Sequence, residues 1–359
     1  MPAAQRFRGP VLPDGEVRDL FVTPEGTITY EPQSGAETVA EGWIVPGLVD
    51  AHCHLGLDDD GAISDEATEQ QAIEDRDGGA LLIRDCGSAA DTTWIHERDD
   101  LPRLIRAGRH IARTKRYIRN YAHEVEPEEL VAYVEQEAQR GEGWVKLVGD
   151  WISREDGDLV PSFPPEAFAA AIAAAHEHGA RVTAHCFGTA VLPGLIEAGI
   201  DCIEHGTGLH TDLIEAMADL GTALVPTVMQ LEKFPQYADA GREKFPDYAA
   251  SMDDLHARRR ETLMAAFDAG VAMYAGSDGG GVSRHGNLSG EVVALRDLGM
   301  PAIDALGAAS WRAREWLGLD GHLAEGTTAD FCVYDADPLQ ELETVHRPAR
   351  IVLRGRVVG

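Results

Sequence analysis

Short apolar runs alternate with helix-like segments through the middle of the chain, and this alternation limits the fold more than any other feature. The segments between the runs, such as 126–140 and 164–178, have the composition and periodicity of helices. The eight runs are Ile44–Val49, Ala80–Arg84, Leu104–Ala112, Trp144–Val148, Ala180–Ala184, Cys202–Glu204, Ala223–Val228 and Val271–Ala275. Eight strand–helix units over about 270 residues predict an α/β protein built on a (β/α)8 TIM barrel. An open doubly wound sheet would also alternate strands and helices, and the count of eight is what favours the barrel.

Both ends of the chain are rich in short strand-like segments. The candidates are Val17–Thr23, Thr27–Tyr30 and Glu37–Val45 near the N-terminus, with 331–335 and 350–358 near the C-terminus. The pair Arg354-Gly355 predicts a hairpin turn within the last segment. Because chain ends often lie close together, we expect residues 1–45 and 318–359 to form a small β-sandwich domain beside a barrel of residues 46–317.

Charge and cysteine content narrow the partners and the compartment. The 359-residue chain has 31 Lys and Arg against 61 Asp and Glu, a formal net charge of −30. This charge repels polyphosphates and anionic lipids, so we expect a small-molecule substrate and neither nucleic acid nor a membrane as partner. The longest apolar run, Ala167–Ala175, is too short for a membrane span, and we expect no secretory signal. Five cysteines, mostly within apolar runs, suit a reducing compartment and predict a cytoplasmic protein.

The strongest local motif is VPGLVDAHCHLG at residues 45–56. Side chains alternate along a strand, so His52 and His54 are expected to point to one side and Cys53 to the other. Two imidazoles with this spacing at a strand end can hold one metal ion. Cys53 is expected to face the core, as are Cys186 and Cys202.

Four more candidate ligands lie at other predicted strands: Lys146 inside the run Trp144–Val148, and His185, His205 and Asp278 at the ends of theirs. Taken singly, each has a simpler interpretation as a lysine paired with a carboxylate, a core histidine or a helix cap. TIM-barrel active sites, however, are built at the carboxyl ends of several strands. We therefore interpret the two histidines of the first motif and these four residues together as a metal site.

With these residues in place, the sequence resembles the amidohydrolase superfamily. The motif VPGLVDAHCH is similar to the family's first strand, and GLDGHLAEGTTADFCVYDADPL resembles the segment that returns from the barrel to the β domain. The resemblance assigns Lys146 to strand 4, His185 to strand 5, His205 to strand 6 and Asp278 to strand 8. It covers nearly the whole chain.

Chemistry separates two branches of this superfamily. The deaminase-like branch has H-x-x-E after strand 5, whereas this chain reads His185-Cys186-Phe187-Gly188, which argues against a mononuclear deaminase. The other branch has a carboxylated lysine on strand 4, and Lys146 in GWVKLVGDW suits that role. The chain thus resembles the prolidase-like amidohydrolases, which include Xaa-Pro and related dipeptidases. Those relatives commonly have Gly-Gly-His after strand 3, and its absence here counts against an ordinary dipeptide specificity.

The resemblance implies two divalent metal ions, with zinc expected, and carboxylation of Lys146 by CO2. His52, His54 and Asp278 would bind one ion, and His185 and His205 the other. Carboxylated Lys146 and a hydroxide would bridge the ions, and Asp278 would be the catalytic residue that accepts the proton and passes it to the leaving amine. The predicted enzyme hydrolyses an amide, either a peptide-like or an N-acyl amino acid bond. Assembly into a homo-oligomer is a family expectation.

Substrate-binding candidates lie on the loops after strands 3, 7 and 8. In TKRYIRNYAHEV, after strand 3, Arg116 is suited to a substrate carboxylate and Tyr117 or Tyr121 to a carbonyl oxygen. The competing interpretation is that these side chains pair with nearby acids. Gln230 after strand 7 and His285 after strand 8 complete the set.

The same six metal-binding residues are also compatible with other functions. A cyclic amide, lactone, carbamate, urea or phosphotriester could be the target, because hydroxide attack serves all of them. A non-catalytic binding protein on the same fold is a further alternative, but the complete set of six ligands argues against it. The metal content would separate these classes, since the hydrolases need two ions, the deaminase one and the binding protein none.

Overall fold

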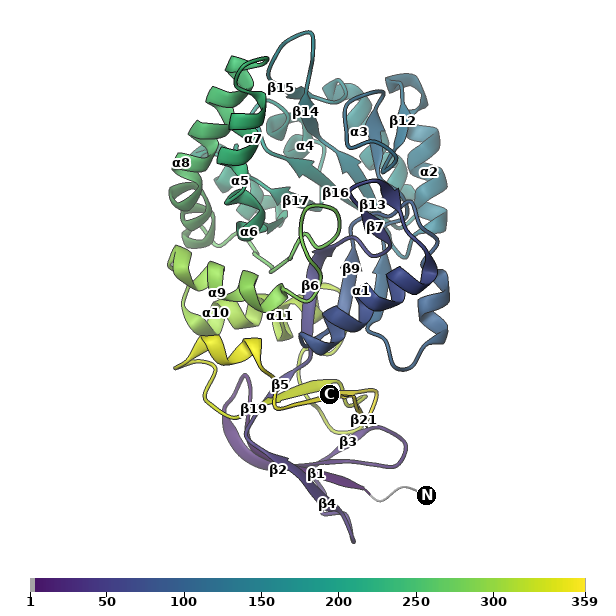
Figure 1. Ribbon diagram of the computed structural model, residues 1–359, viewed down its shortest axis with the longest axis vertical. Helices are drawn as coiled ribbons and strands as arrows, with labels where there is room; N and C mark the ends of the chain where they lie inside the picture. Colours follow the sequence, from purple (N-terminus) through teal and green to yellow (C-terminus); the bar gives the residue numbers. More distant parts are fainter. Residues whose placement is uncertain (1–3, 359) are drawn as a thin grey trace.

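The computed structural model describes residues 4–358 (Figure 1). The two chain ends contribute strands to one sheet, and the middle of the chain forms parallel sheets with helices around them. In Figure 1 the purple N-terminal strands and the yellow C-terminal strands lie together at the bottom, below the α/β part.

The terminal sheet has eight strands in the order β21-β20-β19-β5-β1-β2-β3, with β4 paired to β1. These strands are β1 (Gln5–Val11), β2 (Glu16–Val22), β3 (Ile28–Thr29), β4 (Glu37–Glu41), β5 (Trp43–Pro46), β19 (Phe331–Tyr334), β20 (Arg350–Leu353) and β21 (Arg356–Val357). The antiparallel pair β19–β5 joins the two chain ends. Phe7 and Phe331 pack edge to face at 4.9 Å between ring centroids, in an apolar cluster to which both ends contribute.

The terminal strands differ from prediction in two places. The expected strand Glu37–Val45 is interrupted at Gly42, where a Cβ atom would come 2.5 Å from the carbonyl oxygen of Tyr334. Strand β1 was not predicted, because its glycine and proline disfavour a strand by propensity. The predicted hairpin is confirmed: β20 and β21 are antiparallel, and Arg354 and Gly355 both have positive φ, at 48° and 77°, as a two-residue hairpin turn requires.

The α/β part has parallel strands in the orders β10-β9-β6 and β12-β11-β13-β16-β17-β18. They are β6 (Leu48–Cys53), β9 (Ala80–Asp85), β10 (Arg103–Arg106), β11 (Ile111–Arg113), β12 (His123–Val125), β13 (Trp144–Val148), β16 (Arg181–Cys186), β17 (Cys202–His205) and β18 (Ala223–Val225). The hairpins β7 (Leu57–Asp58) with β8 (Gly61–Ala62) and β14 (Asp150–Ile152) with β15 (Leu159–Pro161) lie in loops between them. Strands β9 and β13 are buried along their whole length, as expected for parallel strands covered on both faces.

Two predicted strands are shorter or broken. The run Leu104–Ala112 divides into β10 and β11 around Gly108, whose φ is 72°; there the Glu137 carboxylate accepts a hydrogen bond from the Arg109 backbone at 2.7 Å. Strand β10 pairs with β9 and β11 with β13, so the divided strand adjoins both parallel sheets. The predicted strand Val271–Ala275 makes an isolated parallel bridge from Met273 to Leu224 of β18.

Helices connect the parallel strands. They are α1 (Asp65–Asp77), α2 (Leu130–Arg140), α3 (Pro165–Glu177), α4 (Leu192–Glu197), α5 (Thr211–Leu220), α6 (Val228–Leu231), α7 (Phe234–Gly241), α8 (Pro246–Asp268), α9 (Leu288–Leu298), α10 (Ala302–Ala308) and α11 (Trp311–Trp316), with short 3-10 helices η1 (Thr93–Glu97), η2 (Pro127–Glu129) and η3 (Leu342–His346). The predicted helices 126–140 and 164–178 are confirmed as η2 with α2 and as α3. Among residues 4–358, no helix is both long enough and apolar enough to cross a membrane.

Candidate metal and active site

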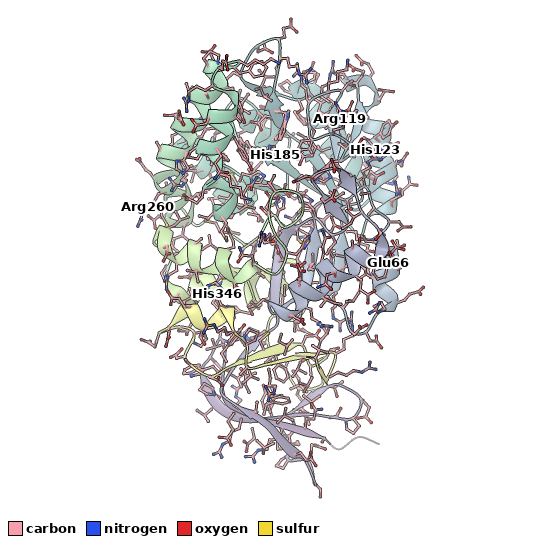
Figure 2. The ribbon with its side chains drawn as sticks, in the orientation of Figure 1. Glu66, Arg119, His123, His185, Arg260 and His346 are labelled. Atoms are coloured by element: carbon pink, nitrogen blue, oxygen red, sulfur yellow. The ribbon has the colours of Figure 1, made fainter. Side chains whose placement is uncertain are left out.

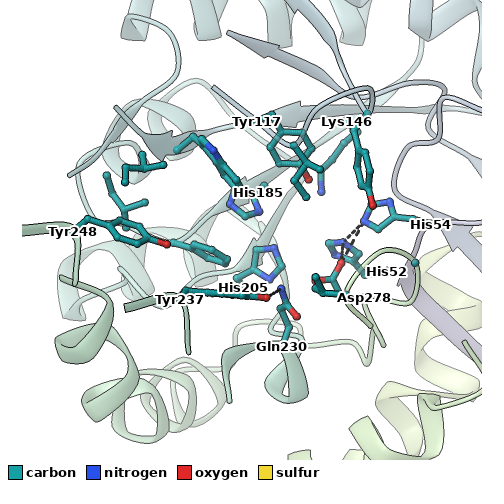
Figure 3. Close-up of a pocket in the computed structure, with 18 residues that line it drawn as sticks. His52, His54, Tyr117, Lys146, His185, His205, Gln230, Tyr237, Tyr248 and Asp278 are labelled. Atoms are coloured by element: carbon teal, nitrogen blue, oxygen red, sulfur yellow. Dashed lines mark hydrogen bonds and ion pairs between the residues drawn. The ribbon is translucent and has the colours of Figure 1, made fainter. Parts of the chain in front are cut away.

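The carboxyl ends of β6, β13, β16 and β17 face one pocket (Figure 3). All six predicted ligands line it: His52, His54, Lys146, His185, His205 and Asp278. Parallel strands in such a fold present their carboxyl ends on the same side, which explains why residues up to 226 positions apart in sequence meet here. The structure therefore brings together every residue of the predicted ligand set.

His52, His54 and Asp278 form a tight triangle of donor atoms. The Nε2 atoms of the two histidines lie 3.1 Å apart, and Asp278 Oδ1 lies 3.1 Å from the first and 3.3 Å from the second; dashed lines in Figure 3 mark the contacts of Asp278. These separations are close to those between ligands of one ion at bond lengths of about 2.0–2.2 Å. His205 is also close, because it offers a nitrogen within 4.8 Å of ligand atoms of His52 and Asp278.

In His54 and His205 the Nδ1 atom has a polar partner that sets the orientation of the ring. His54 Nδ1 donates to the Gly87 carbonyl at 2.9 Å, and His205 Nδ1 lies 2.6 Å from the Thr227 hydroxyl. Metal-binding histidines in proteins are held in this way by backbone carbonyls and polar side chains. His185 Nε2 is buried without a hydrogen-bond partner among the described residues, and a buried lone pair of this kind suits a metal ion.

Backbone strain places three of the residues at this edge. His205, Thr227 and Asp278 have φ of 67°, 47° and 52°, in the left-handed region that non-glycine residues rarely adopt. Such strain costs free energy and tends to be kept at functional sites. It turns the side chains of His205 and Asp278 into the pocket, which the simple alternation of a strand does not predict.

Burial determines the protonation of the site. Burial, assisted by the charge of Lys146, lowers the pKa of His185 to about 3 and that of His52 well below its usual value. Burial also lowers the pKa of His205 strongly. For Asp278, burial opposes ionisation, but the neighbouring imidazoles outweigh it and hold the pKa of the carboxyl well below its usual range. The imidazoles of His52, His185 and His205 are therefore neutral and the Asp278 carboxylate is ionised, which is the state that metal ligands require.

Lys146 has a buried partner that the sequence did not identify. The lysine is only 1% exposed, and its Nζ contacts Oε2 of Glu204, which is fully buried. Glu204 also accepts a hydrogen bond from Thr183 Oγ1 at 2.7 Å and lies 3.5 Å from Nη2 of Arg84. Burial lowers the pKa of Lys146 to about 8. The only signal for Glu204 was its place before His205 in CIEH, where strand alternation predicts opposite faces.

The predicted substrate-binding residues divide into two groups. Tyr117, Tyr121 and Gln230 line the pocket. Arg116 does not line it, because its Nη1 donates to the Pro161 carbonyl at 3.2 Å. The nearby Arg119 is exposed and lies apart from His185 (Figure 2), so the basic stretch after strand 3 provides no cation in the pocket.

His285 also lies outside the pocket wall, in a buried cluster behind β6. Its Nδ1 lies 2.8 Å from Asp75 Oδ2 on α1, and the Gly286 backbone donates to Asp75 Oδ1 at 2.7 Å. Cys53 Sγ packs against both, 3.7 Å from Asp75 and 3.6 Å from His285. All five cysteines are free and buried, as expected. His285 therefore ties the loop that follows Asp278 to α1.

Replacing His285 with alanine is expected to destabilise the fold by about 3–5 kcal/mol, because Asp75 is left as a buried carboxylate without its partner. Burial disfavours the charged imidazole, but the attraction of Asp75 outweighs it and raises the pKa of His285. A raised histidine pKa stabilises the fold fully below the unfolded value of about 6.5, and this stabilisation is lost as pH rises through the folded pKa.

Urea unfolding at several pH values measures this contribution. The matched variant His285→Asn keeps an N–H near the position of Nδ1 but carries no charge. The advantage of the wild type over His285→Asn should be largest at low pH and shrink as pH rises. An advantage that does not change with pH would contradict the charged pair.

Several pocket residues had no recognisable signal in the sequence. Trp151 lies on the hairpin β14–β15, Phe187 follows β16, and Tyr237 and Tyr248 lie on α7 and α8. Together with Tyr117 they give the pocket an aromatic wall. Their periodicity is that of ordinary surface and core positions, so only the packing of these elements reveals their role.

Comparison with known proteins agrees with this geometry. The sequence model described as "Amidohydrolase family" matches residues 43–358. The chain belongs to the amidohydrolase family. An uncharacterised protein of Mycobacterium tuberculosis (strain H37Rv) is 52% identical over 354 residues, covering 98% of this chain and 95% of that protein.

More distant amidohydrolase relatives have names that state an activity. The ochratoxinase of Aspergillus niger is 24% identical, covering 86% of this chain and 73% of that protein. A crystal structure of a Xaa-Pro dipeptidase with bound methionine in its active site superposes with a TM-score of 0.82 at 22% identity, covering 99% of each chain. At this level of identity the second likeness supports a common TIM-barrel-type α/β fold.

Membership of the amidohydrolase family confirms the expectation of an enzyme that hydrolyses carbon–nitrogen bonds. Amidohydrolases generally use divalent metal ions, and the donor set here fits such ions. It offers a buried triangle of two Nε2 atoms and a carboxylate oxygen. It also offers an imidazole nitrogen of His185 that has no hydrogen-bond partner among the described residues, and rings of His54 and His205 that are held by their Nδ1 partners.

Proposed function

We propose that this amidohydrolase cleaves an amide bond with two divalent metal ions, zinc being expected, held by the six residues described above. The observation that carries the proposal is the triangle of His52 Nε2, His54 Nε2 and Asp278 Oδ1, with all edges between 3.1 and 3.3 Å. When bound, divalent ions lower the pKa of water and polarise a carbonyl group. His185 and His205 provide the donors for the second ion.

Lys146 is proposed to react with CO2. The neutral amine attacks the carbon of CO2, an N–C bond forms, one proton is released, and the side chain becomes a carboxylate. The pKa of about 8 supports this step, because it leaves a larger fraction of Lys146 as the neutral amine near neutral pH than a solvent-exposed lysine would have. Arg84 Nη2 stays beside Glu204 and offsets part of the negative charge.

Asp278 is the proposed proton carrier. Among the described residues that line the pocket, it has the only carboxylate. Ionised at neutral pH, it would accept a proton from the attacking water and donate it to the leaving nitrogen. Gln230 lies at the same pocket and can orient a polar group of the substrate.

We also infer that the α/β part is a closed (β/α)8 barrel of residues 46–317 and that 1–45 with 318–359 form the β-sandwich domain. The bridges Leu224–Met273 and Cys53–Gly279 support closure, because they join β18 and β6 through the last segment. The separate apolar cluster of the terminal sheet supports a second domain. Free, buried cysteines support a cytoplasmic location. A small-molecule substrate, no nucleic acid or membrane partner, and a homo-oligomeric state remain part of the proposal.

Metal analysis and a hydrolysis screen test the proposed function together. Protein stripped with a chelator and reconstituted with Zn²⁺ and bicarbonate is expected to hold about two ions per chain. The reconstituted protein should hydrolyse at least one amide in a panel of dipeptides, N-acyl amino acids, aryl amides, cyclic amides, lactones, ureas and phosphotriesters. A single ion would favour the deaminase alternative, and hydrolysis confined to lactones or phosphotriesters would exclude amide cleavage.

A further inference from the structure

The wall of the pocket above the six ligands has no charged side chain. Its aromatic residues are Tyr117, Tyr121, Trp151, Phe187, Tyr237 and Tyr248, and the remainder is aliphatic apart from Gly280 and Gln230. The cavity has a volume of about 260 Å³. This volume is near the lower end of the range for small-molecule sites and suits a compact ligand with one apolar group.

The polar groups on this wall mostly have partners within the protein. The Tyr121 hydroxyl donates to the Asp58 carbonyl at 2.7 Å, and Gln230 Nε2 donates to the Tyr237 hydroxyl at 2.9 Å. Gln230 Oε1 lies 3.4 Å from Ser283 Oγ. None of these groups is a cation, so the wall cannot form an ion pair with a substrate carboxylate.

The nearest cations outside the wall are used elsewhere. Arg116 donates to the Pro161 carbonyl. Lys233 Nζ donates to the Val282 carbonyl at 3.0 Å and lies 2.6 Å from Ser283 Oγ. Both side chains are therefore held by the pocket rim and do not line the cavity.

Acidic residues lie at the same rim. Asp58 is the last residue of β7, and its backbone carbonyl accepts the hydrogen bond from Tyr121. Asp59 lies close to Gly281, because a Cβ atom on that glycine would be 3.7 Å from Asp59 Oδ1. These acids offset the charges of Arg116 and Lys233 at the rim, and the net charge of −30 of the whole chain opposes the approach of an anion. A carboxylate on the wall would also lose its hydration without gaining a partner.

We propose that the enzyme selects an uncharged amide with an aromatic or branched apolar group seated on the aromatic wall, and discriminates against substrates with a free carboxylate. The inference rests on the proposed amide hydrolysis and identifies its substrate class. Among the described residues that line the pocket, positive charge is available to a carboxylate only at the floor, where the carboxylate would take the place of the scissile bond. Tyr117 and Trp151 pack edge to face at 4.9 Å between centroids, so the wall is preformed.

Matched ligand pairs in which an uncharged carboxamide replaces a carboxylate of similar shape test the proposal. Suitable pairs are N-acetylphenylalanine with its primary amide, hippurate with its primary amide, and 4-acetamidobenzoate with 4-acetamidobenzamide. Isothermal titration with metal-loaded protein measures binding, and chromatography of the same mixtures measures hydrolysis. We expect the neutral member to bind at least roughly tenfold more tightly in each pair that binds.

A charge placed on the wall should reverse this preference. Leu159, on β15, lines the pocket and is not a predicted ligand. In Leu159→Arg the carboxylated members should gain affinity relative to their neutral partners, whereas the matched variant Leu159→Met should keep the wild-type order. The variant Leu159→Met changes the shape of the side chain without adding a charge, so it separates the effect of the charge from the effect of the altered shape.

The outcomes distinguish this inference from the proposed function. Equal or tighter binding of the carboxylated members by the wild type, or no binding of any member, would overturn the substrate class. Tighter binding of neutral members without hydrolysis would support the pocket assignment and refute amide cleavage of these compounds. Hydrolysis of carboxylated members alone would support the amidohydrolase activity and overturn the substrate class.

Discussion

Replacing Asp278 with asparagine is expected to lower kcat for amide hydrolysis by about 10²–10⁴-fold, the range typical of a general acid–base residue. The amide has nearly the shape of the carboxylate but cannot accept a proton near neutral pH. Asp278 is held ionised by His52, His54 and His205, and within residues 4–358 no other carboxylate lines the pocket. No second residue is therefore placed to take over the proton.

Steady-state kinetics of Asp278→Asn should be accompanied by metal analysis and circular dichroism. These measurements separate loss of proton transfer from loss of an ion, since Asp278 is also a proposed ligand. Asp212→Asn is a matched control, because it makes the same chemical change at an exposed position of α5. A variant Asp278→Asn with two ions and more than about a tenth of wild-type kcat would contradict the assigned role.

Replacing Lys146 is expected to abolish binding of the second ion and with it nearly all activity. Lys146→Met removes the amine that reacts with CO2, so no bridging carboxylate can form. In protein without metal and CO2, where Lys146 is a free amine, the substitution also leaves Glu204 buried without its closest cation, which is expected to destabilise the protein by about 3–5 kcal/mol. Methionine therefore changes both the metal site and the stability.

Lys146→Arg separates these two effects. Arginine keeps a positive charge beside Glu204 but stays protonated and does not react with CO2. We expect the Arg variant to fold and to bind at most one ion. Wild-type protein prepared in ¹³C-bicarbonate should show a carbamate carbon resonance that Lys146→Arg lacks. Two tightly bound ions in either variant would refute the bridge.

The sequence predicted strands correctly where a local pattern of residues controls them, and less well where a long-range contact does. Strand β13 and the hairpin at Arg354-Gly355 follow from a local apolar run and a turn dipeptide. The run Leu104–Ala112 was predicted as one strand, yet Gly108 and the carboxylate of Glu137 divide it. That division depends on a contact with α2, which no window of local sequence contains.

The same distinction applies to the candidate site. The six candidate ligands were recognised because five of them lie at the ends of predicted strands and the sixth, Lys146, is a charged residue inside the apolar run Trp144–Val148. Parallel strands bring such ends together. Arg116 was selected for its charge, but its guanidinium binds the Pro161 carbonyl. Glu204 was passed over because alternation predicts that it faces away from its neighbour His205, whose positive φ breaks the alternation.

The sequence by itself determined the family, much of the strand–helix order and the six candidate donors, because these depend on residue type, spacing and position at strands. Only the tertiary structure decided the chemistry of the pocket wall and the partner of Lys146. The aromatic wall comes from the hairpin β14–β15, the loop after β16, and helices α7 and α8. Their side chains meet through long-range packing, which leaves no periodic signal in the chain.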